Sequence, residues 1–240
     1  MEPLLDLPRP SPACTRCALR PACIAVGTRG VPDCPLDGLA HPYRRLARGE
    51  RLFTAGDELG SVYLVREGAL KTVTLARDGE EQVLAFHLPG EMMGLDAMAT
   101  GRHRCDAVAL GDTEVCELSF PALQARAAQR PVLQAQLYRA IGLGANRDQE
   151  HVEMLIRRQA SDRIALFLHG IAERTRPIGE AATQLTLPMS REDIARFLGL
   201  ALETVSRGFT RLQDDGVIGV AGRHIDIRAP RELQRLARQA

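Results

Sequence analysis

Three cysteines near the start of the chain have the spacing of metal ligands. Cys14, Cys17 and Cys23 form a C-x2-C-x5-C segment. The short gap lets two thiolates face one metal centre from a single turn of backbone, and the longer gap lets the chain wrap to a third position. Proline- and glycine-containing stretches flank the segment and offer little core for buried cysteines. Because disulfides are rare in cytosolic chains, the pattern predicts metal binding or redox chemistry.

Three thiolates leave such a site one ligand short, because zinc and iron–sulfur sites both favour four. The fourth ligand must come from further along the chain, and the candidates are Cys34, Cys105 and Cys116. Cys105, in an alternating stretch, and Cys34 also fit structural thiols. Spacing alone leaves an iron–sulfur cluster, zinc and a redox dithiol open.

The C-terminal part of the chain has the pattern of a winged helix-turn-helix. Ser190 is a helix N-cap with acidic residues in the following turn, and Gly199 marks a tight turn. A second helix is expected over residues 201–213, followed by two alternating strands, residues 216–220 and 224–227. In such motifs the second helix enters the major groove of DNA.

One face of this second helix carries residues that can read bases. Glu203, Ser206, Arg207 and Thr210 lie three to four residues apart and therefore share a face. Arg207 can donate two hydrogen bonds to guanine, Glu203 can accept one from the cytosine amine, and Ser206 is permissive. The alternative is a solvated face with a Glu203–Arg207 ion pair. We predict recognition of a step that contains a G·C pair, each lost contact costing about 1–3 kcal/mol.

The middle of the chain predicts a β domain followed by helices. Short β-branched runs with glycine-containing turns indicate a sandwich or barrel over about residues 50–120, with a hairpin turn at residues 77–80. Helices are expected over residues 120–130, 131–158 and 161–176.

The long helix has a heptad pattern that favours a dimer. Its apolar seam steps by four and three residues, although its second half is poor in apolar residues. The alternative is a helix packed on the β domain with Asp148 exposed. In a dimer, Asp148 would approach its own copy across a two-fold axis, and the like charges would oppose association. The seam comprises Leu137, Ile141, Gly144, Asp148, His151 and Leu155.

The composition, with 45% hydrophobic and 25% charged residues, is that of a packed globular protein. The formal net charge is +1, yet residues 157–240 hold 14 arginines against 10 acidic residues, as expected of a DNA-facing part. No apolar run reaches the roughly 20 residues of a membrane-spanning helix, and no secretory signal is recognisable. We therefore expect a cytoplasmic protein with no membrane partner. Because no catalytic motif occurs, we expect no enzyme and no small-molecule substrate.

The predicted α+β architecture resembles the CRP/FNR superfamily of transcription regulators, and the resemblance covers nearly the whole chain. It implies a β-roll similar to a cyclic-nucleotide-binding jelly roll between the cysteines and the DNA-binding domain. The implied parts are a cysteine-rich cluster-binding segment (1–35), a β-roll sensor domain (36–130), a dimerisation helix (131–158) and a winged helix-turn-helix domain (159–240).

Two motifs make the resemblance closer to the FNR subgroup, the oxygen-responsive regulators of fumarate and nitrate reductase type. The segment from Glu203 to Arg207 looks like that subgroup's E-x-x-S-R. Cys116 lies just before a predicted short helix, where the family places its distant cluster ligand. The implied ligand set is Cys14, Cys17, Cys23 and Cys116.

This resemblance implies an oxygen-responsive activator and repressor. Without oxygen, a [4Fe-4S] cluster would be bound and the protein would be a homodimer on double-stranded DNA with half-sites similar to TTGAT. Oxygen would convert the cluster to a [2Fe-2S] form and then remove it, and the dimer would fall apart. Our own hypothesis from the sequence is that the cluster ties the N-terminal loop to the strand of Cys116, so that its loss leaves the Asp148 repulsion unopposed. In the family, the loop that corresponds to Asp78, Gly79 and Glu80 contacts RNA polymerase. The expected dimer interface includes Leu137, Ile141, Asp148 and Leu155.

Some residues depart from the family pattern, and two other functions stay open. Ala22 and Ala145 are small where relatives can carry larger apolar residues that shield the cluster and the acid. Zinc in place of the cluster would make the cysteine segment structural. A cyclic-nucleotide-responsive regulator is a further alternative, but Gly90-Glu91 is not followed by the Arg-Ser or Arg-Thr that would hold a cyclic phosphate.

Overall fold

A computed structural model provides the three-dimensional description of the chain. The described residues are 43–76, 79–157, 159–175 and 183–238. The predicted ligands Cys14, Cys17 and Cys23 lie outside them, as do Cys34 and Asp78. Among the described residues, no helix is both long enough and apolar enough to span a membrane.

The chain forms two compact units, each of which takes residues from separate parts of the sequence. Of the described residues, the first unit contains those up to Leu70 and the range His87–Gly144. The second contains the described residues of the hairpin Lys71–Phe86 and those from Ala145 onward.

Two four-stranded sheets form the β part of the fold, in the region where the sequence predicts a sandwich or barrel. The first sheet has the order β1 (Arg44–Leu46), β8 (Thr113–Ser119), β3 (Ser61–Glu67) and β6 (Met92–Met93). The second has the order β2 (Arg51–Phe53), β7 (Asp106–Ala109), β4 (Leu70–Leu75) and β5 (Glu81–His87).

The pleat of β3 and β8 separates two apolar clusters. Val65 lies opposite Val115, and both belong to the interior cluster of the β-roll. Val62 lies opposite Leu118 on the other face of the sheet, where both join a second cluster that includes Leu133. Side chains two residues apart on a strand point to the same face, so each strand serves both clusters.

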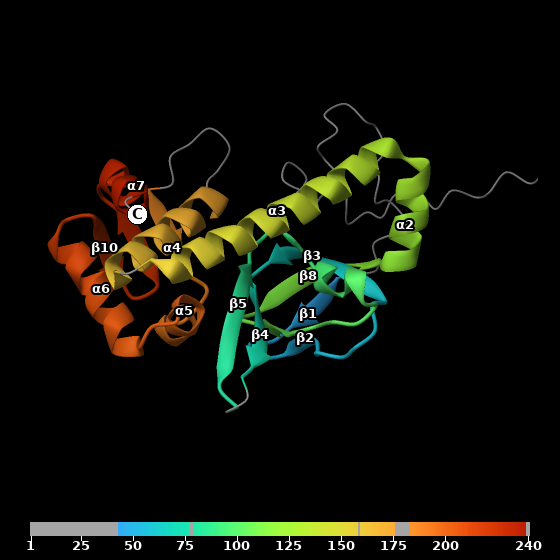
Figure 1. Cartoon of the computed structure of the whole chain (residues 1–240), viewed down its shortest axis with the longest axis horizontal. Helices are drawn as coiled ribbons and strands as arrows, with labels where there is room; N and C mark the ends of the chain where they lie inside the picture. Colours follow the sequence, from blue (N-terminus) through green and yellow to red (C-terminus); the bar gives the residue numbers. More distant parts are fainter. Residues whose placement is uncertain (1–42, 77–78, 158, 176–182, 239–240) are drawn as a thin grey trace, which may run out of the picture. The chain divides into compact units, whose positions relative to one another are not determined.

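Helices cover that second face of the sheet. A short 3-10 helix, η2 (Leu95–Ala99), lies between β6 and β7. The helix α2 (Phe120–Gln129) directly follows β8. The helix α3 (Pro131–Ile156) then runs unbroken for 26 residues (Figure 1), and it begins at the proline that the sequence favours for a first helical position. Leu123 of α2 and Leu133 of α3 pack in the cluster with Val62 and Leu118.

The second unit contains the helix-turn-helix and its wing. Besides the second half of α3, its helices are α4 (Ala160–Thr175), α5 (Arg191–Leu198), α6 (Leu202–Asp214) and α7 (Pro230–Arg238). Its sheet has the order β10 (Ile218–Ala221), β11 (His224–Ile227) and β9 (Gln184–Thr186). The two helices and two strands predicted for this motif are present, whereas β9 and α7 were not predicted.

Candidate functional site

The first helix of the helix-turn-helix has well-formed ends. Ser190 Oγ accepts a hydrogen bond from the Asp193 amide at 3.0 Å, and the Ser190 amide donates to Asp193 Oδ2 at 2.9 Å. This reciprocal capping box satisfies two amides that the first turn leaves without helical partners. Gly199 ends the helix in the left-handed region, with φ at 61°. These caps fix the direction in which the chain enters α6.

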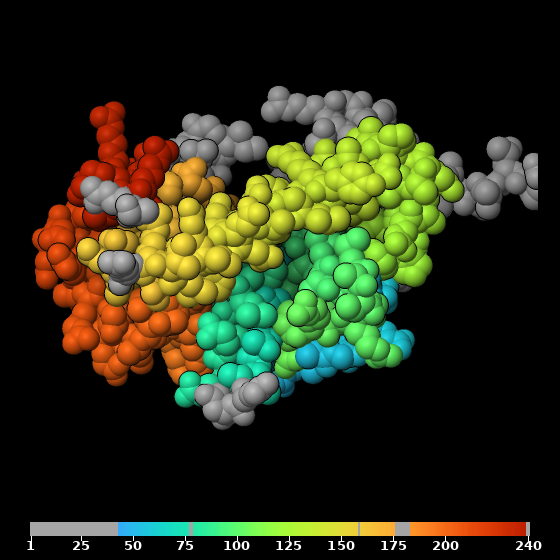
Figure 2. All heavy atoms as spheres, in the orientation of Figure 1, coloured from blue at the N-terminus to red at the C-terminus, as the bar shows by residue number. Residues whose placement is uncertain are grey.

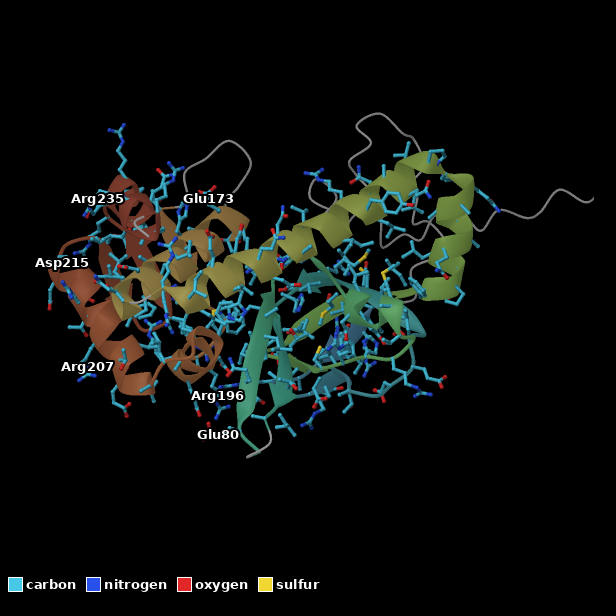
Figure 3. The ribbon with its side chains drawn as sticks, in the orientation of Figure 1. Glu80, Glu173, Arg196, Arg207, Asp215 and Arg235 are labelled. Atoms are coloured by element: carbon cyan, nitrogen blue, oxygen red, sulfur yellow. The ribbon has the colours of Figure 1, made fainter. Side chains whose placement is uncertain are left out.

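The second helix presents the predicted base-reading face to solvent. Val205, Phe209 and Leu212 are buried. Glu203, Ser206 and Arg207 are exposed on the other side of α6, and Figure 3 shows the Arg207 side chain directed outward from the helix. The second unit therefore displays together the three residues that the sequence assigns to DNA recognition.

A close approach of α6 to α4 holds this face in place. A Cβ on Gly208 would overlap with Ile164 Cδ1, and Ile164 is fully buried. A methyl group at position 208 would displace the end of the buried Ile164 side chain, so the absence of a side chain at Gly208 allows this close packing.

We expect Gly208→Ala to lower the free energy of unfolding by about 1–3 kcal/mol, despite the better helix propensity of alanine. Ile164→Val removes the clashing methyl group, so the double variant should recover part of the loss. Urea titrations followed by circular dichroism measure both effects. The control is Gly142→Ala, since a Cβ at this helical glycine meets nothing within 4 Å. A Gly208→Ala variant as stable as wild type would contradict the packing.

The wing between β10 and β11 places two more polar side chains at the surface. Arg223 and His224 are exposed beside Gly222, whose φ of 63° makes the tight turn. Arg223 Nη1 donates to the carbonyl oxygen of Pro188 at 2.9 Å, and His224 Nδ1 lies 2.9 Å from Thr186 Oγ1. The wing is thus tied to the segment that leads into α5.

The hairpin between β4 and β5 carries Gly79 and Glu80, two of the three residues predicted to contact RNA polymerase, whereas Asp78 lies outside the described residues. The Ala76 amide donates to the Glu80 carbonyl at 2.8 Å, and the Gly79 amide donates to the Ala76 carbonyl at 2.9 Å. Gly79 has a φ of 84°, as the turn requires. Glu80 lies at this turn (Figure 3), and Leu75 beside it is 69% exposed.

One face of α3 contacts the protein's own units. In the first unit, Leu137 packs against the cluster around Leu133. In the second unit, the His151 ring stacks on Phe197 with centroids 3.9 Å apart. Leu155 Cδ2 lies 3.6 Å from where a Cβ of Gly199 would stand. Two of the four residues predicted for a dimer interface, Leu137 and Leu155, therefore have intramolecular contacts.

The imidazole of His151 serves this intramolecular packing. Its Nε2 lies 2.7 Å from the carbonyl oxygen of Phe197. Burial lowers the pKa of His151 below its ordinary value, although hydrogen bonds to backbone carbonyls and the charge of Asp148 oppose the shift. The neutral ring, stacked on Phe197, is thus the form that the fold favours.

A different face of α3 is exposed and apolar. Tyr138 is 65% exposed and Val152 is 62% exposed, and Ile141 is also exposed. Together with Ala145 and Asp148 they follow a heptad spacing, which we call the α3 stripe. Figure 2 shows atoms of α3 at the surface along this helix. The sequence identified Ile141 and Asp148 but missed Tyr138 and Val152, although the same spacing runs through them.

Cys116 lies on the sheet face that carries the helix-packing cluster. It is half-buried on β8, directly opposite Leu64 of β3. The next pair along the ladder on this face is Val62 and Leu118, which pack against α2 and α3. A group bound to Cys116 would stand one step along the sheet from the residues that hold the start of α3.

Cys105, another candidate for the fourth ligand, is poorly suited to bind metal. It is 5% exposed, and its Sγ lies 3.7 Å from Asp96 Oδ2. Burial and the Asp96 carboxylate raise the pKa of the Cys105 thiol to about 12. Because the thiolate is the form that binds metal, this environment favours Cys116 over Cys105 as a ligand.

The Asp96 carboxylate also accepts hydrogen bonds from the loop that precedes β7. Asp96 Oδ2 accepts a hydrogen bond from the Arg104 amide at 2.8 Å, and Asp96 Oδ1 lies 3.2 Å from His103 Nδ1. The Asp96 carboxylate therefore engages donors of this loop from within the protein. Among the described residues, no group of three or more His, Cys, Asp or Glu side chains could hold a metal ion.

A β-roll followed by a winged helix-turn-helix with an exposed polar recognition face defines a DNA-binding transcription regulator. The cyclic nucleotide-binding domain family matches residues 43–130, and the Crp-like helix-turn-helix domain family matches residues 162–236. The chain belongs to the CRP/FNR family of transcription regulators, as its motifs predicted.

The relatives agree with a regulator rather than an enzyme. The chain is 42% identical to the transcriptional activator protein Anr of Pseudomonas protegens, over 93% of this chain and 92% of that protein. It is 34% identical to the fumarate and nitrate reduction regulatory protein of Escherichia coli, over 93% and 90% respectively. The solved structure of FixK2 from Bradyrhizobium japonicum matches with a TM-score of 0.75 at 32% identity, covering 84% of this chain and 98% of that chain.

Proposed function

We propose that this protein is an oxygen-sensing transcription regulator controlled by a [4Fe-4S] cluster on Cys14, Cys17, Cys23 and Cys116. The observation that carries the proposal is the position of Cys116. It is half-buried on β8, beside the apolar residues that pack against the start of α3. Its similarity to a fumarate and nitrate reduction regulatory protein supports an anaerobic role. Thiolates are the preferred ligands of such clusters, which oxygen can destroy.

The four thiols would act as a brace. Three of them would come from the N-terminal segment, and Cys116 would connect that segment to the sheet face beneath α2 and the start of α3. Without this brace, the repulsion between the Asp148 carboxylates of two subunits would oppose association along the α3 stripe. The dimer, joined along Tyr138, Ile141 and Val152, would thereby be stable only in the absence of oxygen.

The DNA-binding role assigns one half-site to each α6. Glu203, Ser206 and Arg207 would read a half-site similar to TTGAT, and the partner subunit would read the inverted copy about one helical turn, ~34 Å, away. The hairpin tip at Asp78, Gly79 and Glu80 would contact RNA polymerase and so couple DNA binding to activation.

The expected result of purification without oxygen is a brown protein with about four iron and four sulfide per chain, which bleaches in air. Cys116→Ser should lose this iron, because it removes the ligand that joins the segment to β8. Metal and sulfide analysis with visible absorption spectroscopy measures the difference.

Cys105→Ser is the matched control and should keep the iron, since Cys105 is buried against Asp96. A colourless protein that contains zinc and no sulfide would contradict the proposed cluster and indicate a structural zinc site instead. Iron retained in Cys116→Ser and lost in Cys105→Ser would assign the fourth ligand to Cys105.

A further inference from the structure

The only lysine in the sequence, Lys71, connects the β4–β5 hairpin to the helix-turn-helix within the second unit. Its side chain is 12% exposed. Its Nζ donates to Glu81 Oε1 on β5 and, at 2.8 Å, to Asp193 Oδ1 in the first turn of α5. Burial opposes the charged ammonium, but hydrogen bonds to Asp193 and Glu81 outweigh burial and raise the pKa of Lys71. The lysine therefore stays charged between two carboxylates from separate parts of the chain.

The other end of α5 has contacts with the same hairpin. Arg196 Nη1 lies 3.2 Å from Glu81 Oε1, while its Nη2 lies 2.7 Å from Glu192 on its own helix. Gln82 Nε2 donates to the backbone carbonyl of Arg196. Figure 3 shows Arg196 beside the hairpin that carries Glu80. The side chains of Lys71, Glu81 and Gln82 thus hold α5 near both of its ends, and we call this group the hairpin clasp.

Aromatic packing lies next to the hairpin clasp. The Phe86 ring of β5 has centroid distances of 5.1 Å to Phe197 of α5 and 6.1 Å to Phe167 of α4. Phe197 is also the ring on which His151 of α3 stacks. The helix α5 is therefore held by the hairpin on one side and by the second half of α3 on another.

This arrangement bears on DNA recognition because α6 follows α5 through the short Gly199–Leu200 turn. A change in the direction of α5 must move α6 with it. In a dimer that reads two half-sites, the two recognition helices have to match successive major grooves, so a small tilt of each α5 alters the spacing between them. Buried ion pairs often add little net stability, and fixing one geometry is their best-attested use.

We propose that Lys71 is a positioning residue for DNA recognition, which sets the direction of α5 and thereby the half-site spacing that the protein accepts. The inference rests on the proposed dimer. Lys71→Met keeps the length of the side chain and removes the charge, whereas Lys71→Arg keeps a cation that can bond both carboxylates.

The test uses full-length protein purified without oxygen and DNA duplexes with two inverted TTGAT half-sites. Further duplexes have one or two base pairs added or removed between the half-sites, and another has a single half-site. Lys71→Met should bind the correctly spaced palindrome about tenfold more weakly than wild type and discriminate less against altered spacings. Binding to the single half-site should not change, and Lys71→Arg should restore the spacing preference.

Arg235→Met is the matched control, because Arg235 forms an ion pair with Glu232 on α7 outside the hairpin clasp. If Lys71→Met does not fold, Glu81→Gln and Gln82→Ala each remove fewer of these contacts and should weaken the spacing preference in the same direction. A Lys71→Met variant with wild-type spacing preference would overturn the proposal. Absence of any spacing preference in the wild type would instead contradict the proposed dimer.

Discussion

Replacing Arg207 with alanine is expected to abolish sequence preference while leaving salt-sensitive nonspecific DNA binding. Arg207 is exposed on α6 and can donate two hydrogen bonds to guanine in the major groove. Loss of a bidentate contact costs about 1–3 kcal/mol per half-site, and a dimer loses it twice. We therefore expect the affinity ratio between specific and random DNA to fall by about 30-fold to about 20,000-fold. Fluorescence anisotropy titrations over a range of salt concentrations measure both affinities.

The control for this variant is Arg211→Ala, which removes the same charge one turn further along α6. Arg211 is exposed and lies 3.9 Å from Asp215 in a weak ion pair. We expect Arg211 to contact a DNA phosphate, which carries no sequence information, so its loss should weaken specific and nonspecific binding alike. If Arg207→Ala kept its preference for the TTGAT-like site, α6 would not be the recognition helix.

The helix-turn-helix could be predicted from the sequence because its signals are local. Ser190 and Gly199 each mark a helix end by their own chemistry, and both ends stand where the sequence put them. The strand β9 has only one buried residue, Leu185, and three residues give too short an alternation to recognise. Similarly, α7 has two buried residues, Leu233 and Ala237, and its many charged residues conceal this apolar side.

The two faces of α3 show where sequence periodicity is insufficient. Leu137 belongs to a heptad that the protein's own units cover, whereas Tyr138 begins one that stays exposed. Both patterns step by four and three residues, so the sequence cannot tell which face meets another subunit. The fold separates them, because it shows which side chains already have intramolecular partners.

Long-range charge contacts and thiol environments were also beyond the sequence. Lys71 and Asp193 are 122 residues apart, and only the folded chain brings their charges together. Spacing alone left both Cys105 and Cys116 as candidate ligands, and only the fold shows that burial and Asp96 raise the pKa of the Cys105 thiol. The sequence shows which side chains are ionisable, whereas only the fold shows which of them are buried and which lie in contact.

Asp148→Ala should dimerise in air, whereas the wild type is expected to be monomeric there. Asp148 lies on the exposed α3 stripe between Ile141 and Val152, and across a two-fold axis its carboxylate would meet its own copy. At a few ångströms and an effective dielectric constant of about 20, two like charges repel by about 3–4 kcal/mol. Allowing for salt and relaxation, we expect the dimer dissociation constant to fall by about 10- to 100-fold.

Sedimentation equilibrium measures this dissociation constant directly. The control is Glu150→Ala, because that exposed acid lies on the other side of α3. Should Asp148→Ala dimerise no better than Glu150→Ala, charge repulsion along the α3 stripe would not be what opposes dimer formation.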